Sequence, residues 1–230
     1  MTRVDRPVSV ALLLGVLSMT AEAEDFDSKL KSYMDARATE LEEISEERKA
    51  ELSHVAKYVQ SKVTTGQLAQ LTFICTHNSR RSHLSQLWAA AAAQYYNIDK
   101  VQTFSGGTEA TEFNPRAVAA LQRSGMLIES EQRSENPRYL VRFSESTAPQ
   151  ICFSKVYDDK PNPTQNYCAV MTCSQADAAC PVVSGAEMRI AIPYEDPKVA
   201  DNTAEESEKY DERSAQIARE MLYVFSQVRN

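Results

Sequence analysis

The sequence predicts an α/β fold built on a parallel sheet, because segments with strand and helix character alternate along its middle. The alternation consists of strands at 71–74 and 101–105 and helices at 82–96 and from 115 onward. The second helix is well marked, since Asn114 is a good N-cap, Pro115 suits the first helical position and Gly125 ends the helix.

The rest of the chain adds strands and a closing helix. Three further strands are predicted, at 150–154, 168–172 and 189–192. The segment 128–149 is polar and poorly patterned, which predicts a loop or a short helix. The last helix is predicted to start at Thr203, because Thr203 and Glu206 have the spacing of a capping box.

The N-terminal third divides into two parts. In residues 1–23, two arginines precede an apolar run at 8–19 and an Ala21-Glu22-Ala23 end. The run is shorter than the roughly 20 residues that span a bilayer, so we predict a signal peptide and an exported, periplasmic protein; an uncleaved anchor or a buried helix is the alternative. Residues 24–66 are predicted to be a helical extension, as one long or two shorter amphipathic helices, and 67–230 the main domain.

Composition excludes several classes of function. A charged content of 25% excludes a membrane-embedded body, and a net charge of −7 argues against nucleic-acid binding. The chain has five cysteines, too few and too unevenly spread for a disulfide-stapled miniprotein. An odd number leaves at least one thiol free if the protein is exported. No histidine has partners at metal-ligand spacing, so no metal site is predicted.

The first candidate site is the loop that follows the first strand. Cys75 ends this strand and Arg81 comes six residues later, where the next helix begins; the loop residues are Thr76, His77, Asn78, Ser79, Arg80, Arg81 and Ser82. Backbone N–H groups and a helix N-terminus favour a bound oxyanion, and the same field favours a thiolate. Cys75 is therefore a candidate nucleophile and Arg81 a candidate anion clamp. A buried cysteine with a solvent-facing arginine is the alternative.

The second candidate site lies after two later strands. Cys173 and Cys180 follow the strand at 168–172, and Asp196 follows the strand at 189–192. Loops at the carboxyl ends of parallel strands gather on one face, so these residues are expected to share a crevice with Cys75. Cys173 is then a second thiol able to attack a cysteine adduct, and Asp196 is a carboxylate able to protonate a leaving oxygen. The alternatives are a structural disulfide between Cys173 and Cys180 and an ordinary turn aspartate.

Four segments resemble the low-molecular-weight protein tyrosine phosphatase superfamily, and within it most closely the thioredoxin-coupled arsenate reductases. They are CTHNSRRS, SGGTEATEFNPRAVAALQRSG, MTCSQADAACPV and YEDP. The resemblance covers roughly residues 69–228 and implies a doubly wound, four-stranded parallel sheet. It also implies that Cys75 is the nucleophile, Arg81 the oxyanion ligand and Asp196 the general acid.

The resemblance assigns the remaining roles to the loop and to the other two thiols. Ser82 would hydrogen-bond the Cys75 thiolate, and Asn78 would hold the shape of the loop. Cys173 would attack the arsenic adduct on Cys75 to release arsenite, and Cys180 would then attack Cys173. The resulting disulfide would be reduced by a thioredoxin-like protein or another thiol reductant, and no tightly bound cofactor is expected.

Two loop residues depart from the family pattern, and three functions stay open. His77 replaces a glycine whose backbone can adopt positive φ, and Arg80 replaces a cysteine. Export would require a periplasmic thioredoxin-like donor, or else would make Cys173–Cys180 a permanent bridge. The three functions are an arsenate reductase, a phosphatase acting on phosphotyrosine or small phosphate esters, and a non-catalytic protein that binds an oxyanion or a partner.

Overall fold

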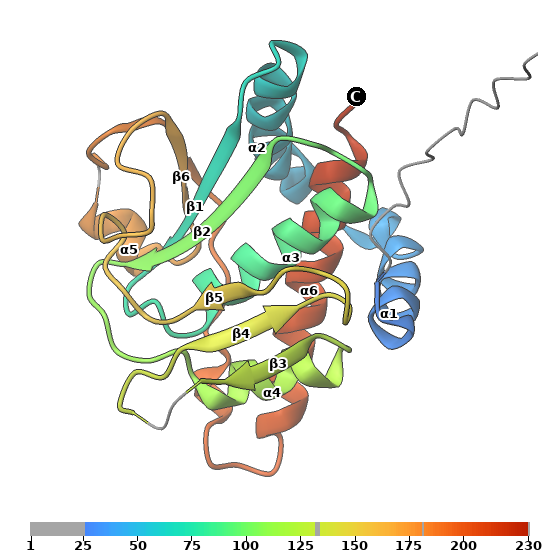
Figure 1. Ribbon diagram of the computed structural model, residues 1–230, viewed down its shortest axis with the longest axis vertical. Coiled ribbons are helices and arrows are strands. Elements are labelled where there is room, and N and C mark those ends of the chain that lie inside the picture. Colours follow the sequence, from blue (N-terminus) through green and yellow to red (C-terminus); the bar gives the residue numbers. More distant parts are fainter. Residues whose placement is uncertain (1–25, 132–133, 181, 230) are drawn as a thin grey trace, which may run out of the picture.

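The computed structural model describes residues 26–131, 134–180 and 182–229 and contains two sheets flanked by helices (Figure 1). The larger sheet is parallel and has the strand order β2-β1-β6-β7. Its strands are β1 (Ala69–Cys75), β2 (Val101–Gly107), β6 (Tyr167–Met171) and β7 (Ala186–Ala191). This sheet confirms the predicted α/β fold.

Helices cover both faces of the parallel sheet. They are α2 (Glu46–Thr64), α3 (Arg81–Tyr95), α5 (Ser174–Ala179) and α6 (Glu206–Ser226). A further helix, α4 (Pro115–Arg123), packs against α6 and β3. In β1, Leu71 and Phe73 join a large core with residues of α3 and α6, whereas Ile74 joins a smaller cluster with a residue of α5. Alternate residues of a strand point to opposite faces, so α5 lies on the face opposite to α3 and α6. The sheet is therefore doubly wound, as expected.

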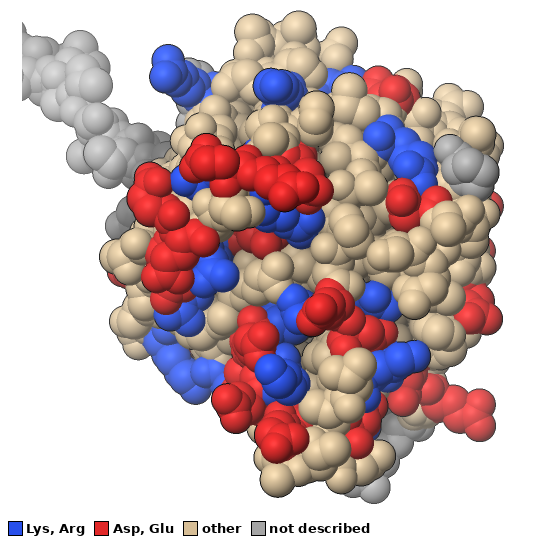
Figure 2. All heavy atoms as spheres, turned by 180° about the vertical axis from the view of Figure 1, so that it is seen from behind, with Lys and Arg blue, Asp and Glu red and all other residues tan. Residues whose placement is uncertain are grey.

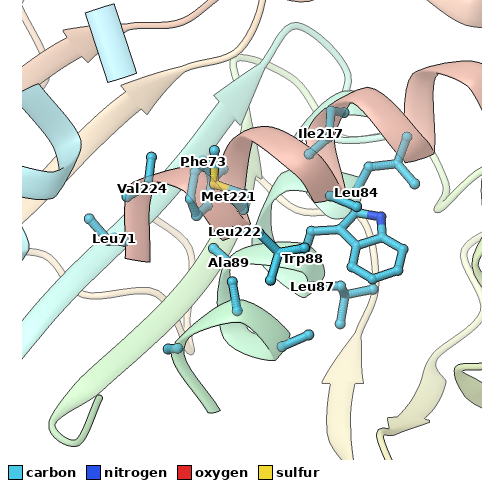
Figure 3. Close-up of a cluster of buried hydrophobic side chains, with 14 of the residues drawn as sticks. Leu71, Phe73, Leu84, Leu87, Trp88, Ala89, Ile217, Met221, Leu222 and Val224 are labelled. Atoms are coloured by element: carbon cyan, nitrogen blue, oxygen red, sulfur yellow. The ribbon is translucent and has the colours of Figure 1, made fainter. Parts of the chain in front are cut away.

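Much of the large core lies between the sheet and the helices α3 and α6. Figure 3 shows side chains of α3 and α6 gathered beside Leu71 and Phe73 of β1. Trp88 of α3 is almost completely buried there, and its indole N–H donates to the Ser214 hydroxyl at 3.0 Å. The indole buries a large apolar area without leaving its one polar group unpaired.

The segment before the sheet forms two shorter helices, one of the two predicted arrangements. Its elements are α1 (Ser28–Ala38), a 3₁₀ turn (Leu41–Glu43) and α2. Leu30 and Met34 of α1 and Leu52 and Val55 of α2 are fully buried and belong to the large core. The amphipathic stripe seen in the sequence therefore packs onto the rest of the molecule.

A second sheet replaces the predicted loop or short helix at 128–149. The strands β3 (Leu127–Ser130), β4 (Tyr139–Arg142) and β5 (Gln150–Cys152) pair antiparallel in that order. The prediction failed because β3 and β4 have four residues each and bury only Ile128 and Val141, too little for a strand pattern. The strand predicted at 150–154 exists as β5, but in this sheet.

The start of α6 also differs from the sequence expectation. The helix begins at Glu206, three residues after Thr203. The Thr203 hydroxyl accepts from the Glu205 N–H at 3.3 Å, and the Glu206 carboxylate accepts from the Asn202 N–H at 2.6 Å. Both side chains therefore bond within the turn before the helix, and they do not form the reciprocal pair of a capping box.

The face of the molecule that is hidden in Figure 1 carries both acidic and basic side chains (Figure 2). Figure 2 shows acidic and basic side chains interspersed over this face. Arg48 of α2 bridges to the nearly buried Glu220 of α6 at 2.8 Å, and Lys49 pairs with Glu42 and Glu46.

No helix among the described residues combines the length and apolar character needed to cross a bilayer. The predicted signal peptide lies outside the described residues.

Candidate active site

The loop after β1 is fixed to the fold through its carbonyl groups. Three groups from two segments donate to it: Glu109 N–H to Thr76 O (2.9 Å), Asn114 N–H to Ser79 O (2.9 Å) and the Ser154 hydroxyl to His77 O (3.0 Å). Within the described chain, none of the N–H groups of residues 76–82 donates to another residue. Unpaired N–H groups at a loop and helix start are suited to an anion, as the sequence suggested.

Asn78 shapes the centre of the loop. Its backbone has φ +44°, the left-handed region that asparagine tolerates better than most residues. Its side chain is fully buried, donating to the Ser82 hydroxyl at 2.8 Å and accepting from the Lys155 N–H at 2.9 Å. His77 has no positive φ, so its side chain causes no backbone strain at this position. The loop residue with positive φ is Asn78.

The Cys75 thiol is buried beside the start of α3. Its sulfur lies 3.1 Å from the Ser82 hydroxyl oxygen. Because Ser82 accepts the Asn78 amide, its own hydroxyl proton is available to donate to the sulfur. Such a donated hydrogen bond stabilises negative charge on sulfur. Asn78, Ser82 and Cys75 therefore form one hydrogen-bonded chain.

Arg81 and Asp196 are brought together, as the sequence predicted for loops at one edge of the sheet. The Arg81 guanidinium donates to the Asp196 carboxylate at 2.8 Å and to the Tyr194 carbonyl at 3.1 Å. Both side chains are largely buried, and the Nε of Arg81 has no partner among the described residues. The anion clamp and the candidate acid are thus paired with each other, and an oxyanion would compete with Asp196 for Arg81.

Arg80 points to the same carboxylate from a different direction. Its Nη1 lies 3.7 Å from Asp196, and its Nε donates to the Tyr210 hydroxyl at 3.0 Å. Tyr210 in turn donates to Asp201 at 2.8 Å. No sequence pattern marks Tyr210 or Asp201 as supports of the loop, because α6 and the turn before it approach the site only in the folded chain.

Cys173 lies against the Cys75 loop. Its sulfur is 3.5 Å from the Thr76 hydroxyl, and both cysteines belong to the same small buried cluster. Cys173 also caps α5, accepting the Ala176 N–H at 3.4 Å. Cys180 caps the other end of α5 and is half-buried against the same cluster. The expected crevice therefore holds Cys173 next to the loop, whereas Cys180 is one short helix away.

A cleft of about 590 Å³ opens beside Arg81 and Asp196. It is bounded by Arg81, by the start of α5 and by the segment after β7: Ser174, Gln175, Pro193, Tyr194, Glu195, Asp196, Lys198 and Val199. Figure 1 shows α5 beyond the carboxyl ends of β1 and β2, where a doubly wound sheet binds ligands. The cleft joins Arg81 and Asp196 to the residue that follows Cys173.

Two buried titratable side chains, those of Lys155 and His83, lie close to the loop. Burial lowers the pKa of Lys155 to about 8. Burial, with the charge of Lys155 second, lowers the pKa of His83 well below its usual value, so His83 is neutral; its Nδ1 lies 3.1 Å from the Ser105 hydroxyl. Burial raises the pKa of Cys152 to about 12 and that of Cys168 further, so these two strand cysteines remain thiols.

No group of three or more His, Cys, Asp or Glu side chains is arranged to hold a metal ion within the described ranges. All five cysteines carry free thiols. The structure therefore represents the reduced protein.

The comparison with known proteins agrees with this arrangement. Over 134 residues the chain is 30% identical to the arsenate reductase of Halalkalibacterium halodurans, covering 58% of this chain and 78% of that protein. The chain belongs to the arsenate reductase family. It is therefore an enzyme, as its sequence motifs predicted.

The chain is also similar to a second arsenate reductase and to a solved phosphatase structure. Arsenate reductase 2 of Staphylococcus haemolyticus is 32% identical over 111 residues, 48% of this chain and 65% of that protein. A solved low-molecular-weight protein tyrosine phosphatase from T. tengcongensis aligns at 15% identity over 70% of this chain and 99% of its own, with a TM-score of 0.47. No family model matches the chain.

Proposed function

We propose that this protein reduces arsenate to arsenite with a three-cysteine relay of Cys75, Cys173 and Cys180. The observation that carries the proposal is the position of the second thiol. The Cys173 sulfur lies 3.5 Å from the hydroxyl of Thr76, the residue after Cys75, and both cysteines belong to the same buried cluster. A phosphatase of this superfamily needs no thiol there. A reductase needs one within reach of the Cys75 adduct.

Arsenate would first displace the contact between Arg81 and Asp196. The free N–H groups of residues 76–82 would surround its oxygens, and Arg81 would turn from the Asp196 carboxylate to the oxyanion. This exchange frees Asp196 at the moment when a proton is needed. The Asp196 carboxylate would take up the proton that the Cys75 thiol loses as it becomes the nucleophile, and would pass it to the arsenate hydroxyl that leaves as water.

The chemistry follows from thiolate substitution. Cys75 sulfur bonds to arsenic(V) as water departs, giving a thiol–arsenate adduct. The Cys173 thiolate attacks the Cys75 sulfur, the S–As bond breaks, and arsenic keeps the electron pair and leaves as arsenite. Cys180 then attacks Cys173, which releases the Cys75 thiolate and leaves a Cys173–Cys180 disulfide.

The cycle closes by reduction of that disulfide from outside. An external dithiol supplies the two electrons and two protons, and we propose a thioredoxin-like protein as the donor. Cys180, the more accessible thiol of the pair, is the one a donor reaches first. If the protein is exported, as its N-terminal sequence predicts, the donor must act in the same compartment.

A phosphatase is the second candidate, because Cys75, Arg81 and Asp196 are a complete set for phosphoester hydrolysis without the other cysteines. Cys75 would take the phosphoryl group and Asp196 would protonate the leaving alcohol. The position of Cys173 favours the reductase over this alternative.

Single cysteine variants separate the two functions. With arsenate and a dithiol, we expect arsenite from the wild type and none from Cys75→Ser. Cys173→Ser should retain a Cys75–arsenic adduct, and Cys180→Ser should stop after one turnover with a Cys75–Cys173 disulfide, both seen by intact-protein mass spectrometry. The control Cys152→Ala removes a buried strand thiol outside the relay and should leave the rate within about twofold.

Full turnover by Cys173→Ser would contradict the relay. Aryl phosphate hydrolysis that is lost in Cys75→Ser and kept in Cys173→Ser would establish the phosphatase. If neither substrate reacts and phosphate still raises the melting temperature, the protein binds oxyanions without catalysis.

A further inference from the structure

The two relay cysteines Cys173 and Cys180 are held apart by α5. They are the residues immediately before and after this six-residue helix. A helix rises about 1.5 Å per residue, so seven steps separate their Cα atoms by about 10 Å. A disulfide needs Cα atoms within about 7 Å. The pair therefore bonds only when α5 unwinds, and whatever holds α5 as a helix also controls the thiol pair.

One side chain outside α5 holds its C-terminal half. Arg189 of β7 donates from Nη2 to the Asp177 carbonyl at 2.7 Å and from Nε to the Cys180 carbonyl at 3.0 Å. The same Nη2 lies 2.5 Å from the Asp177 carboxylate. Carbonyls at a helix C-terminus lack partners within the helix, and a cation there also suits the helix dipole.

These contacts exist only while α5 is helical. The two carbonyls lie three residues apart in sequence, and the turn between them brings both within reach of one guanidinium. β7 is paired to β6 and does not move with α5, so unwinding must break the three contacts of Arg189. The reduced, helical state gains their stabilisation, and the disulfide state does not.

We propose that Arg189 is a positioning residue that latches α5 in its helical form, keeps Cys180 away from Cys173 in the reduced enzyme, and limits how readily the pair closes. Asp177 is the anionic half of this latch. The role in turnover rests on the proposed reductase activity, whereas the latch itself is a property of the two thiols and can be measured without arsenate.

The test measures closure of the pair in the full chain carrying Cys75→Ser, so that Cys173 has no other relay partner. Azodicarboxamide is the oxidant: two thiols give two electrons and two protons to its N=N bond and form one disulfide. Mass spectrometry follows the Cys173–Cys180 disulfide over time. A glutathione buffer then gives the equilibrium constant for the same pair.

Arg189→Met is expected to close the pair about tenfold faster and to shift the equilibrium about tenfold toward the disulfide, or about 30 mV for a two-electron couple. Asp177→Asn keeps the carbonyl contacts and removes one charge, so the closure rate and the equilibrium constant are each expected to rise about threefold. The matched control is Arg142→Met, because Arg142 is 27% exposed like Arg189 and also has a carboxylate partner, Glu129, but lies in the second sheet. It should leave both values unchanged.

Closure in Arg189→Met at the rate of Arg142→Met would overturn the latch. If Arg189→Met does not fold, Asp177→Asn decides: faster closure supports the latch, and an unchanged rate overturns it. Faster closure in a protein that fails to reduce arsenate would keep the latch and remove the proposed function. Arsenite production by the wild type, together with unchanged closure in Arg189→Met, would keep the proposed function and remove the latch.

Discussion

The Cys75 loop and α5 face each other across the cleft, but the fold holds them in different ways. The loop has its carbonyls bonded to two separate segments, the connection between β2 and α4 and the residues after β5, and the Asn78 side chain is bonded on both sides. In contrast, α5 is six residues long, and among the described residues the carbonyls of its C-terminal half are bonded from outside by the Arg189 side chain. One half of the site is preformed, and the other half is built to change.

This difference matches what the proposed reaction requires of each half. Binding a tetrahedral anion requires N–H groups fixed in advance, because any ordering of the loop would reduce the affinity. A relay between Cys173 and Cys180 requires the opposite, a segment whose helical and unwound forms differ by little free energy. Changes to the loop should therefore affect oxyanion binding, and changes to α5 should affect the thiol pair.

Gly107→Ala should have the largest effect on the preformed half. A Cβ at Gly107 would lie 2.2 Å from the Glu109 carbonyl and 2.7 Å from both the Asn78 nitrogen and the Thr76 carbonyl. All three atoms are backbone, so the loop or β2 must move, and we expect a loss of about 3 kcal/mol in the free energy of unfolding. Phosphate should then no longer raise the melting temperature.

Gly66→Ala is the matched control for this variant. Gly66 has φ +68°, but its nearest neighbour to a Cβ is the flexible Lys100 ammonium at 3.6 Å. It should cost about 1 kcal/mol and leave phosphate stabilisation intact. An equal loss of phosphate stabilisation in both variants would mean that the loop is not held by its contact with β2.

Asn78→Ala should have the next largest effect, about 2 kcal/mol in the free energy of unfolding. It removes the two buried side-chain hydrogen bonds and places alanine at φ +44°. Asn78→Gly removes the same bonds without the backbone strain, so it should be about 1 kcal/mol more stable than the alanine variant. Denaturant titration measures both, and equal stabilities would show that the strain at position 78 is negligible.

The sequence predicted the loop half of this comparison better than the α5 half. Strand, loop and helix at 71–96 carry their own local signals, so Cys75, Arg81 and the loop between them could be assigned from the residues alone. The contact of Arg189 with α5 joins residues whose positions depend on the pairing of β7 with β6. No local pattern encodes such a contact.

The difference between local signals and long-range contacts also explains where the predicted fold was wrong. Asn114 and Pro115 mark the start of α4 by local chemistry, and the structure confirms it: Asn114 accepts the Arg116 N–H at 2.9 Å. In contrast, β3 and β4 are strands only because they pair with each other and with β5. Long-range pairing decided the second sheet, and tertiary contacts set where α6 begins.

His77→Ala should have the smallest effect, although His77 is one of the two loop residues that depart from the family pattern. Its side chain is 40% exposed and its one partner, Glu109, is 59% exposed at 2.9 Å. Exposed pairs of this kind contribute little, so the change in the free energy of unfolding should stay within about 0.5 kcal/mol. The loop uses the carbonyl of this residue, bonded to Ser154, and alanine keeps that carbonyl.

Ser154→Ala is the comparison that isolates this backbone contact. The Ser154 hydroxyl donates to the His77 carbonyl and accepts the Thr111 N–H at 2.8 Å, and it is almost fully buried. Its loss should cost about 1–3 kcal/mol and weaken phosphate stabilisation more than His77→Ala does. If His77→Ala proves the more damaging of the two, the imidazole itself contacts the oxyanion, and the loop is held less by its carbonyls than their bonds indicate.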